Sequence, residues 1–458
     1  MRREIVIKLS AFLTLLAALA SVGCVSQYAV RLTDVRRDFY DSGDPGSARE
    51  EIEKRLKRAS SNERSVWTLN EASVDFALGD FESAKTNLRA VRDEFDVLEE
   101  TRMRSLAEDA LTFATDDSFA KYEGDDYEKV MIRATLAISE LMTGGGDAKA
   151  YARQISAKQD EIVARGQIAD PRDARKTINP KLKYPRAPLG PYIEGLLWEE
   201  TFMDSSEAAR LYEKVVAWRP QFKQGQSDLR RAREGVHSHP GAGRLYVFAY
   251  VGRGPRKVQG SAEATQFALL IADQIFSATN KYSVPPTLAP VPIPELVVEE
   301  PQVASIELSA DGETQGCTET LADVNEMAIK QFEATRDQII ARAIVRRIVK
   351  KGAIYAAKEA AQVNGWVSLA MDAAGVAWEA TEVADARCWG LLPAKIQTYG
   401  CELPTGERTL EFRPIDASGR LCGEPTRVQA RIDANRNTYV LVVYPDGRPM
   451  GAPIVSTR

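Results

Sequence analysis

The stretch from Trp67 to Asp96 reads WTLNEASVDFALGDFESAKTNLRAVRDEFD. Its apolar residues recur three and four positions apart, which places them on one face of an α-helix. Gly79 and Asp80 interrupt this periodicity, which resumes directly after them. Gly79 can adopt the positive φ that ends a helix, and Asp80 can cap the next one. The stretch therefore predicts two helices joined by a tight turn, with the small Ala84 letting them approach closely.

The same centre occurs earlier, where Gly43 is followed by Ala48 at the corresponding spacing. This pattern resembles the tetratricopeptide repeat, whose centre is G-D-[FY]-x-x-A. The separation of Gly43 from Gly79 is close to the family period of about 34 residues. The resemblance implies stacked helix pairs that bind a polypeptide on their concave face.

Two further helix–turn–helix patterns follow, from Tyr127 to Ile162 and from Tyr192 to Pro220. In the second, Ala208 and Pro220 match second-helix positions. The proline-rich stretch 163–191 separates the two patterns and predicts a long extended connection. We expect a TPR-like helical domain over 24–235. A generic array of helical hairpins without a superhelical groove is the alternative.

Residues 1–23 have the parts of a secretory signal, with basic residues, a short apolar run and small residues before Cys24. The apolar run is shorter than the about 20 residues that span a bilayer. A cysteine at this point is typical of a bacterial lipoprotein signal, although Ser21 stands where that motif usually has an aliphatic residue. We predict that Cys24 is lipidated and begins the mature chain. An ordinary cleaved signal with a chance cysteine is the alternative.

The other four cysteines are in the last third of the sequence: Cys317, Cys388, Cys401 and Cys422. An even number in an exported chain predicts two disulfides, with three possible connectivities. Buried free thiols are the alternative.

Composition narrows the classes of function. The 458 residues predict two or three domains at roughly 150 residues each. The net charge of −5 gives no support for nucleic-acid binding. The chain has only two histidines, His237 and His239, without suitably spaced further ligands, so we expect a loop rather than a metal site. No nucleophile motif is present, and we expect neither an enzyme nor a cofactor.

In the second half of the sequence, the period at which apolar residues recur changes. Strands are expected at 244–251, 395–401, 408–412, 427–432 and 438–444, where the pattern shifts from a period of 3.6 to a period of 2. A helix is expected from Ser261, as its N-cap, to Phe276, and another from Thr320 to Lys351. The overall prediction is an α+β chain in which a TPR-like array precedes a β-rich, sandwich-like domain. That domain spans 240–458 and has a helical insertion at 319–386.

Three stretches together resemble a little-studied family of bacterial tetratricopeptide-repeat-containing envelope lipoproteins. They are DDYEKVM at Asp125–Met131, RDQIIARAIV at Arg336–Val345, and ADARCWGLLPAKIQT at Ala384–Thr398. The resemblance implies an envelope lipoprotein without an assigned reaction, in an envelope-assembly context. The family usually has a serine-like residue at the position of Cys388, which implies that disulfides are particular to this branch.

One helical stretch has a second interpretation. IIARAIVRRIVKK at 339–351 places basic residues among aliphatic ones, as in helices that lie on anionic membranes. Acidic residues earlier on the same helix favour instead a core-facing helix with a solvated basic edge. Trp389 can anchor a peptide on an exposed edge, but it more often belongs to a core.

The leading hypothesis is a lipid-anchored scaffold facing the periplasm, in the outer membrane, that binds a partner protein or peptide in envelope assembly or cell-wall maintenance. A cell-envelope enzyme with an unrecognised site, or a membrane-active protein that uses the helix 339–351, is the alternative. A concave groove lined by the first helices of the repeats would favour the scaffold.

Overall fold

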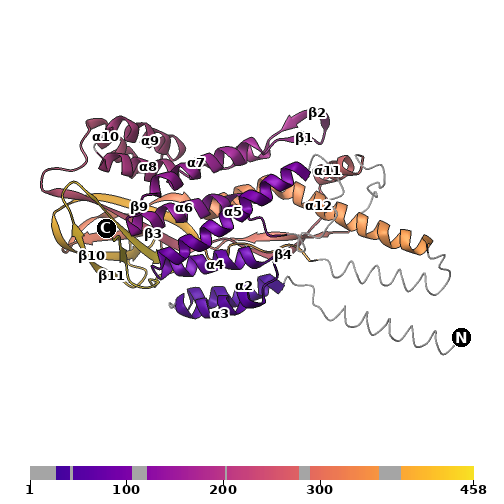
Figure 1. Ribbon diagram of the computed structural model, residues 1–458, viewed down its shortest axis with the longest axis horizontal. Coiled ribbons are helices and arrows are strands. Elements are labelled where there is room, and N and C mark those ends of the chain that lie inside the picture. The colour runs from indigo at the N-terminus through magenta and orange to yellow at the C-terminus, as the bar shows by residue number, and fades with distance from the viewer. Residues whose placement is uncertain are drawn as a thin grey trace.

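A computed structural model describes residues 27–41, 45–105, 121–201, 204–277, 289–360 and 383–457. It is a mixed α and β structure, 49% helical and 25% strand, with 11 helices in the described residues. The predicted signal at 1–23, Cys24 and Gly43 lie outside these residues. Figure 1 shows an elongated molecule, with strands gathered near one end and helices along its length.

The described residues up to Glu234 are mostly helical, and each helix packs against the next along the chain. The helices are α2 (Gln27–Tyr40), α3 (Pro45–Arg58), α4 (Arg64–Ala77), α5 (Phe81–Ser105), α6 (Asp126–Thr143), α7 (Ala148–Ala164), α8 (Leu189–Glu200), α9 (Ser205–Trp218) and α10 (Lys223–Glu234).

Local chemistry explains the turn at the centre of this layer. Gly79 has a φ of +79° between α4 and α5, as its position after the last helical turn predicts. Asp80 accepts a hydrogen bond from the backbone N–H of Ser83 at 3.2 Å and so caps α5. Ala84 is fully buried where α4 and α5 meet. The two predicted helices and their turn are confirmed.

The stretch 163–191 is more structured than the predicted extended connection. It contains a hairpin of β1 (Ile168–Asp170) and β2 (Asp173–Ile178), then a 3₁₀ turn, η2 (Pro180–Lys183). Asn179 caps η2 by accepting a hydrogen bond from Lys181 N at 3.0 Å. Pro180 suits the first position of η2, because proline is tolerated at the first turn of a helix. The prediction of an extended connection was wrong.

The second half of the chain supplies most of the strands. They are β3 (Ala242–Arg253), β4 (Arg256–Ala262), β5 (Val291–Val297), β6 (Ser305–Ala310), β7 (Glu313–Cys317), β8 (Glu319–Asp323), β9 (Pro393–Pro404), β10 (Gly406–Ile415), β11 (Thr426–Ile432), β12 (Asn437–Tyr444) and β13 (Ile454–Val455). The two helices of this half are α11 (Gln266–Ser277) and α12 (Val324–Ala360).

Two larger sheets are formed, with strand orders β13-β12-β3-β9-β8 and β11-β10-β6-β7, and β4 pairs with β5 alone. Strand β3 is parallel to β12 and antiparallel to β9. Its alternate residues serve two cores. Leu245 and Val247 pack in the core shared with the four-stranded sheet. Tyr246 and Phe248 face a core shared with the helices.

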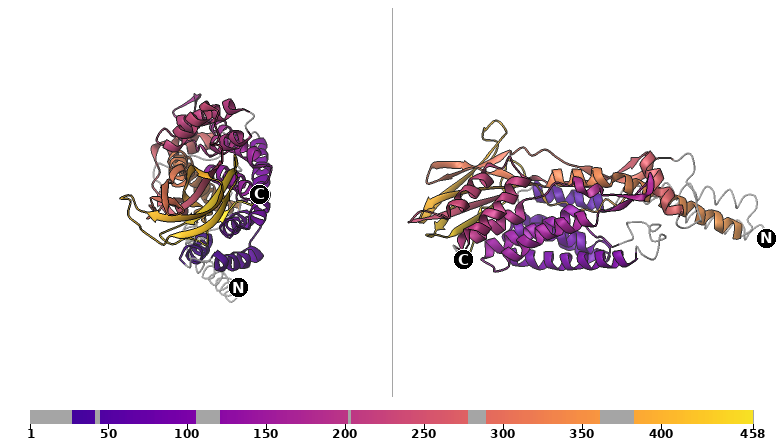
Figure 2. Two further views of the ribbon diagram at one scale, coloured as in Figure 1. Left: turned by 90° about the vertical axis from the view of Figure 1, so that its left-hand side faces the viewer. Right: turned by 90° about the horizontal axis from the view of Figure 1, so that it is seen from above.

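The five-stranded sheet is therefore the middle of three layers, between the smaller sheet and the helices (Figure 2). The helix-facing core runs from Tyr28 to Met450 without a break at the predicted boundary between 235 and 240. A third core joins α11, α12 and the β4–β5 hairpin. The first helices of the pairs are thus covered by the chain's own second half.

Two predicted element boundaries were wrong. Ser261 lies in β4 rather than capping a helix, and α11 begins only at Gln266, with the Thr265 hydroxyl accepting from Ala268 N at 3.1 Å. The predicted helical insertion at 319–386 begins with strand β8, and Ala384 to Ala386 are not helical. Residues 361–382 of that insertion lie outside the described residues. No helix in the described parts is long and apolar enough to cross a membrane.

Candidate functional site

Helix α6 is enclosed on every side. All residues from Tyr127 to Met142 are buried. The helix contacts α5, α7, α8, α12 and β12. Because burying a charge is costly unless it is paired, its charged residues must find partners inside the protein. The candidate site is built around the first turn of this helix.

A reciprocal pair of hydrogen bonds closes that first turn. The Asp125 carboxylate accepts from the backbone N–H of Glu128, and Glu128 Oε2 accepts from Asp125 N at 2.9 Å. The Tyr122 hydroxyl donates to the same Glu128 oxygen. Lys257 on β4 places its Nζ 2.6 Å from Asp125 Oδ2. A helix cap has thereby become a buried polar cluster, which we call the Glu128 cluster (Tyr122, Asp125, Glu128 and Lys257).

Burial dominates the electrostatics of this cluster. It raises the pKa of Glu128 to about 7, and the nearby Asp125 carboxylate adds to the rise, while Lys257 opposes it. Burial by itself lowers the pKa of Lys257, but attraction to Asp125 and Glu128 is stronger, so that pKa is raised. Lys257 therefore stays charged, and Glu128 changes protonation near neutral pH.

An extended segment lies against this cluster. The carbonyls at positions 388, 390 and 392 accept hydrogen bonds from Tyr28 (2.8 Å), Arg36 and Tyr40 (3.1 Å). These three donors are on one helix, α2, and the acceptors are every second carbonyl, as expected when an extended chain presents one edge to a partner. We call residues 388–392 the Trp389 segment.

Trp389 fixes the segment between two helices. Its backbone N–H donates to Glu128 Oε1 at 2.6 Å, and its indole N–H donates to Ser73 Oγ on α4 at 2.7 Å. Only 1% of the residue is exposed. The inner face of the helical layer thus holds an extended, tryptophan-bearing peptide, and that peptide belongs to the chain itself.

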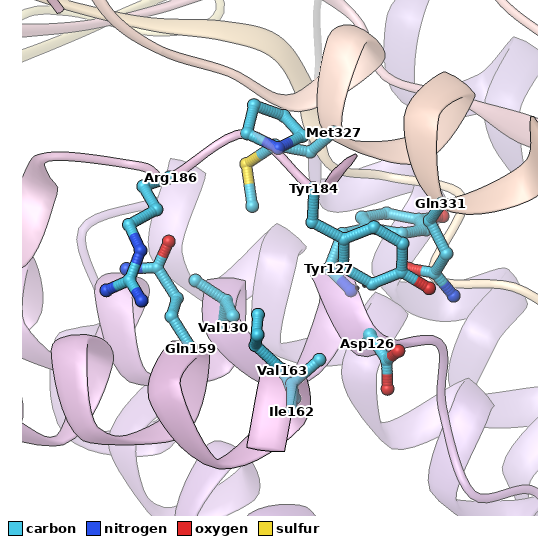
Figure 3. Close-up of a pocket in the computed structure, with 11 residues that line it drawn as sticks. Asp126, Tyr127, Val130, Gln159, Ile162, Val163, Tyr184, Arg186, Met327 and Gln331 are labelled. Atoms are coloured by element: carbon cyan, nitrogen blue, oxygen red, sulfur yellow. Dashed lines mark hydrogen bonds between the residues drawn. The ribbon is translucent and has the colours of Figure 1, made fainter. Parts of the chain in front are cut away.

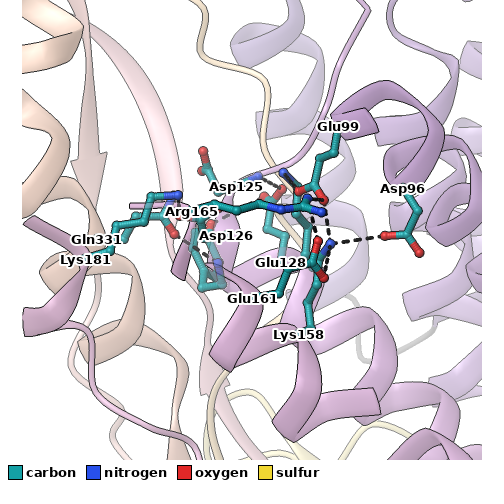
Figure 4. Close-up of polar contacts among 12 residues, drawn as sticks. Asp96, Glu99, Asp125, Asp126, Glu128, Lys158, Glu161, Arg165, Lys181 and Gln331 are labelled. Carbon is teal, nitrogen blue, oxygen red and sulfur yellow. Dashed lines mark hydrogen bonds and ion pairs between the residues drawn. The ribbon is translucent and has the colours of Figure 1, made fainter. Parts of the chain in front are cut away.

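Ion pairs tie the neighbouring helices together behind the cluster (Figure 4). Glu99 on α5 lies 2.6 Å from Lys129 on α6 and 2.5 Å from Lys158 on α7. Lys158 also lies 3.2 Å from Asp96. Burial alone raises the pKa of Glu99, but the two lysines overcome it and lower that pKa to about 2. The Glu99 carboxylate therefore stays ionised at neutral pH and pairs α5 with both α6 and α7.

A small pocket opens on the other side of the α6 start (Figure 3). Val130, Ile162 and Met327 give it apolar walls, and Asp126 and Tyr184 also line it. The empty space is about 390 Å³, including the mouth. The Tyr127 backbone N–H donates to Gln331 Oε1 on α12 at 2.9 Å, which joins the two sides of the pocket.

The predicted repeat positions are structural. Ala48 and Ala208 are fully buried in second helices, as Ala84 is. Pro220 is exposed directly after α9. Asp204 caps α9 by accepting from Ser206 N at 3.0 Å. None of these residues belongs to the Glu128 cluster.

The predicted disulfides are not formed, because all four described cysteines are free thiols. Cys388 is buried in the core between the helices and the sheet. Cys401 and Cys422 pack against the other core, between the two sheets. Pairing Cys388 with Cys401 or Cys422 would have to cross the middle sheet, because these cysteines lie in different cores. Buried or half-buried free thiols, the alternative, are what the structure has.

The two histidines form hydrogen bonds or ion pairs within the protein. His237 is buried, and its Nε2 lies 2.9 Å from Asn437 Oδ1. His239 Nδ1 lies 2.9 Å from Glu402 Oε1. Among the described residues, no group of three or more potential ligands could hold a metal ion.

Arg346 and Arg347 are 8% and 7% exposed, so the expected solvated basic edge was wrong at these positions. Arg347 donates to two backbone carbonyls, at positions 289 and 290, both at 2.9 Å. The apolar residues of this helix, such as Ile340 and Ile344, fill the third core.

Sequence reasoning missed the Glu128 cluster. The pattern Asp125-x-x-Glu128 before an apolar run is a capping-box signal and could have been found. The contribution of Lys257 could not, because it arrives from a strand more than a hundred residues away. The site does unite two of the quoted stretches, Asp125–Met131 and Ala384–Thr398, through the hydrogen bond from Trp389 to Glu128.

Comparisons of the chain with models of protein families, with curated proteins and with solved structures each found no match.

Proposed function

We propose that this chain is a lipid-anchored scaffold of the bacterial envelope, facing the periplasm, which binds a partner protein or peptide. In this proposal Cys24 carries the anchor, the helical layer is a TPR-like array, and the two larger sheets form a sandwich that braces it. The leader-like residues 1–23 and the resemblance to envelope lipoproteins support the compartment.

One observation carries the proposal of peptide binding. Side chains of α2 and α6 hold the Trp389 segment through its backbone, and Ser73 on α4 accepts a hydrogen bond from the Trp389 indole N–H. A repeat array holds an extended ligand in a similar way. Because the chain itself fills this part of the inner face, an external partner must use other surfaces. The outer faces of the second helices, α3, α5, α7 and α9, are the surfaces left to it.

Cross-linking in whole cells tests the proposal. The native protein and a Cys24→Ala form are cross-linked and purified, and the co-purifying proteins are identified. Cys422→Ala is the matched control, since it removes a cysteine at the far end of the chain. We expect a defined envelope protein with the native and control forms, and loss of it with Cys24→Ala.

The mass of the peptide that contains Cys24 is measured on the same material. An acylated peptide supports the anchor independently of any partner. An unmodified Cys24 would refute the anchor, and an acylated protein that captures no defined partner in any form would refute the scaffold.

A further inference from the structure

One end of the molecule gathers the starts of several elements. Arg31 near the start of α2 lies 2.7 Å from Glu63, directly before α4. Asn62 in turn accepts from the backbone N–H of Tyr122, before α6, at 3.2 Å. Lys181 of η2 lies 2.7 Å from Asp126 at the start of α6. These contacts connect the start of α2 to η2. Figure 1 shows the β1–β2 hairpin away from the end that holds β10 and β11, and shows α12 projecting beyond that hairpin.

The β1–β2 hairpin and η2 carry an excess of positive charge at this end. The stretch 168–186 has six basic and two acidic residues, in a chain whose net charge is −5. The side chains of Arg175 and Lys176 are 90% and 73% exposed. Both pair with Asp173, but pairs this exposed are weak and leave the charges available to solvent. Lys183 is also exposed.

An exposed leucine interrupts these charges. Leu182 is 71% exposed between Lys181 and Lys183, the largest exposed fraction of any large hydrophobic residue in the described parts. The hairpin is held in place rather than hanging free. Arg172 lies over the ring of Phe267 on α11, 5.8 Å from its centroid, and Gln274 donates to the carbonyl of Asp170 at 3.2 Å.

The proposed lipid anchor at Cys24 implies that a bilayer lies near the start of α2. Cys24 is three residue steps from Gln27, the first residue of α2, and these steps span about 10 Å at most. If Cys24 is acylated, as the proposed function requires, the start of α2 lies within that distance of the bilayer surface. An apolar side chain flanked by basic ones suits the interface between headgroups and acyl chains.

We propose that Arg175, Lys176, Leu182 and Lys183, the basic hairpin surface, rest on a membrane that contains anionic phospholipids. Leu182 enters the interface, and the three basic side chains contact the headgroups. The inference rests on the proposed anchor.

Hydrogen–deuterium exchange on the full acylated protein tests this. The protein is reconstituted in vesicles of phosphatidylcholine, with or without 30% phosphatidylglycerol. We expect exchange in peptides covering 172–183 to slow at least fivefold only in the anionic vesicles. Each basic residue near an anionic surface contributes about fivefold to its occupancy, and salt screens this attraction.

Two triple variants make the test specific. Arg175→Glu/Lys176→Glu/Lys183→Glu is expected to abolish the protection, and Leu182→Asn to weaken it. The control is Arg420→Glu/Arg427→Glu/Arg431→Glu, which makes the same charge change at residues that are 81%, 70% and 74% exposed and also paired to acids. The control should keep the protection.

The outcomes separate the anchor from the surface. Absent protection with an acylated Cys24 overturns the surface contact and leaves the anchor standing, as does equal protection in both kinds of vesicle. An unacylated Cys24 refutes the anchor, and the same exchange measurement on that protein mixed with vesicles still decides the surface. Protection that requires an added envelope protein overturns the lipid contact in favour of a protein partner.

Discussion

Replacing Trp389 by alanine tests whether the helices and the sheets form one cooperative unit. The side chain fills the core between α4, α6 and the middle sheet, and its indole N–H bonds to Ser73 at 2.7 Å. Truncating a buried tryptophan to alanine costs about 3–5 kcal/mol. Losing the indole donor adds about 1 kcal/mol, because the Ser73 oxygen loses the hydrogen bond that it accepts from the indole. We expect Trp389→Ala to lower the free energy of unfolding by about 4–6 kcal/mol.

Two probes read the two halves separately in one denaturant titration. Far-UV circular dichroism at 222 nm follows the helices. Alkylation of Cys401, which packs between the two sheets, follows the strands. Because the core from Tyr28 to Met450 is continuous, both probes should shift together to lower denaturant with an unchanged slope.

Two further variants define the origin of the effect. Trp389→Phe keeps most of the volume and loses the donor, so it should cost about 1–2 kcal/mol. Trp218→Ala, at a half-buried tryptophan on α9, should also cost only about 1–2 kcal/mol. Separate helix and strand transitions, of which only one responds to Trp389→Ala, would refute the single cooperative unit. A denaturation midpoint that Trp389→Ala leaves unchanged would refute the burial of Trp389.

Two more predictions concern titratable groups. Glu128, with its pKa raised to about 7, keeps its proton in the folded protein where the unfolded chain has lost it. Its contribution to stability is therefore greatest below about pH 4.5 and is lost, up to about 3 kcal/mol, as pH rises to 7. Urea unfolding of the native protein should show this loss of stability between pH 5 and 8, and Glu128→Gln should show a flatter profile. Equally flat profiles for the two proteins would contradict the prediction. Burial raises the pKa of Cys388 to about 12, so iodoacetamide at pH 8 should leave this thiol unmodified until the protein unfolds. Mass mapping that finds Cys388 modified as readily as Cys422 in the folded protein would contradict its burial.

Local patterns predicted the helices well. The pairs α4–α5 and α8–α9 follow directly from apolar spacing, a left-handed glycine at Gly79 and an N-cap at Asp204. The strands β3 and β12 were visible from their length and their aliphatic and aromatic content. These signals are encoded within a dozen residues, so a single sequence contains them.

Pairings between distant segments could not be predicted in the same way. Strand β12 lies parallel to β3, and its Asn437 is paired with Arg244, 193 positions earlier. This pairing depends on the whole intervening chain. The burial of Arg346 and Arg347 has the same origin, because the carbonyls at 289 and 290 that receive Arg347 come from another segment. A basic edge looks solvated in sequence whenever its acceptors are not local.

The Trp389 segment shows how such pairings affect the interpretation of function. Helical repeats in a sequence suggest an open inner face that awaits a ligand. Here α4 and α6 are mostly buried and the inner side of α2 is covered, because β3 and the Trp389 segment pack against them. A search for partners aimed at this inner face would find it occupied, and substitutions there would lower stability before they lowered binding. Surface substitutions on α3, α5, α7 and α9 avoid that ambiguity, so they are the ones that can separate partner binding from folding.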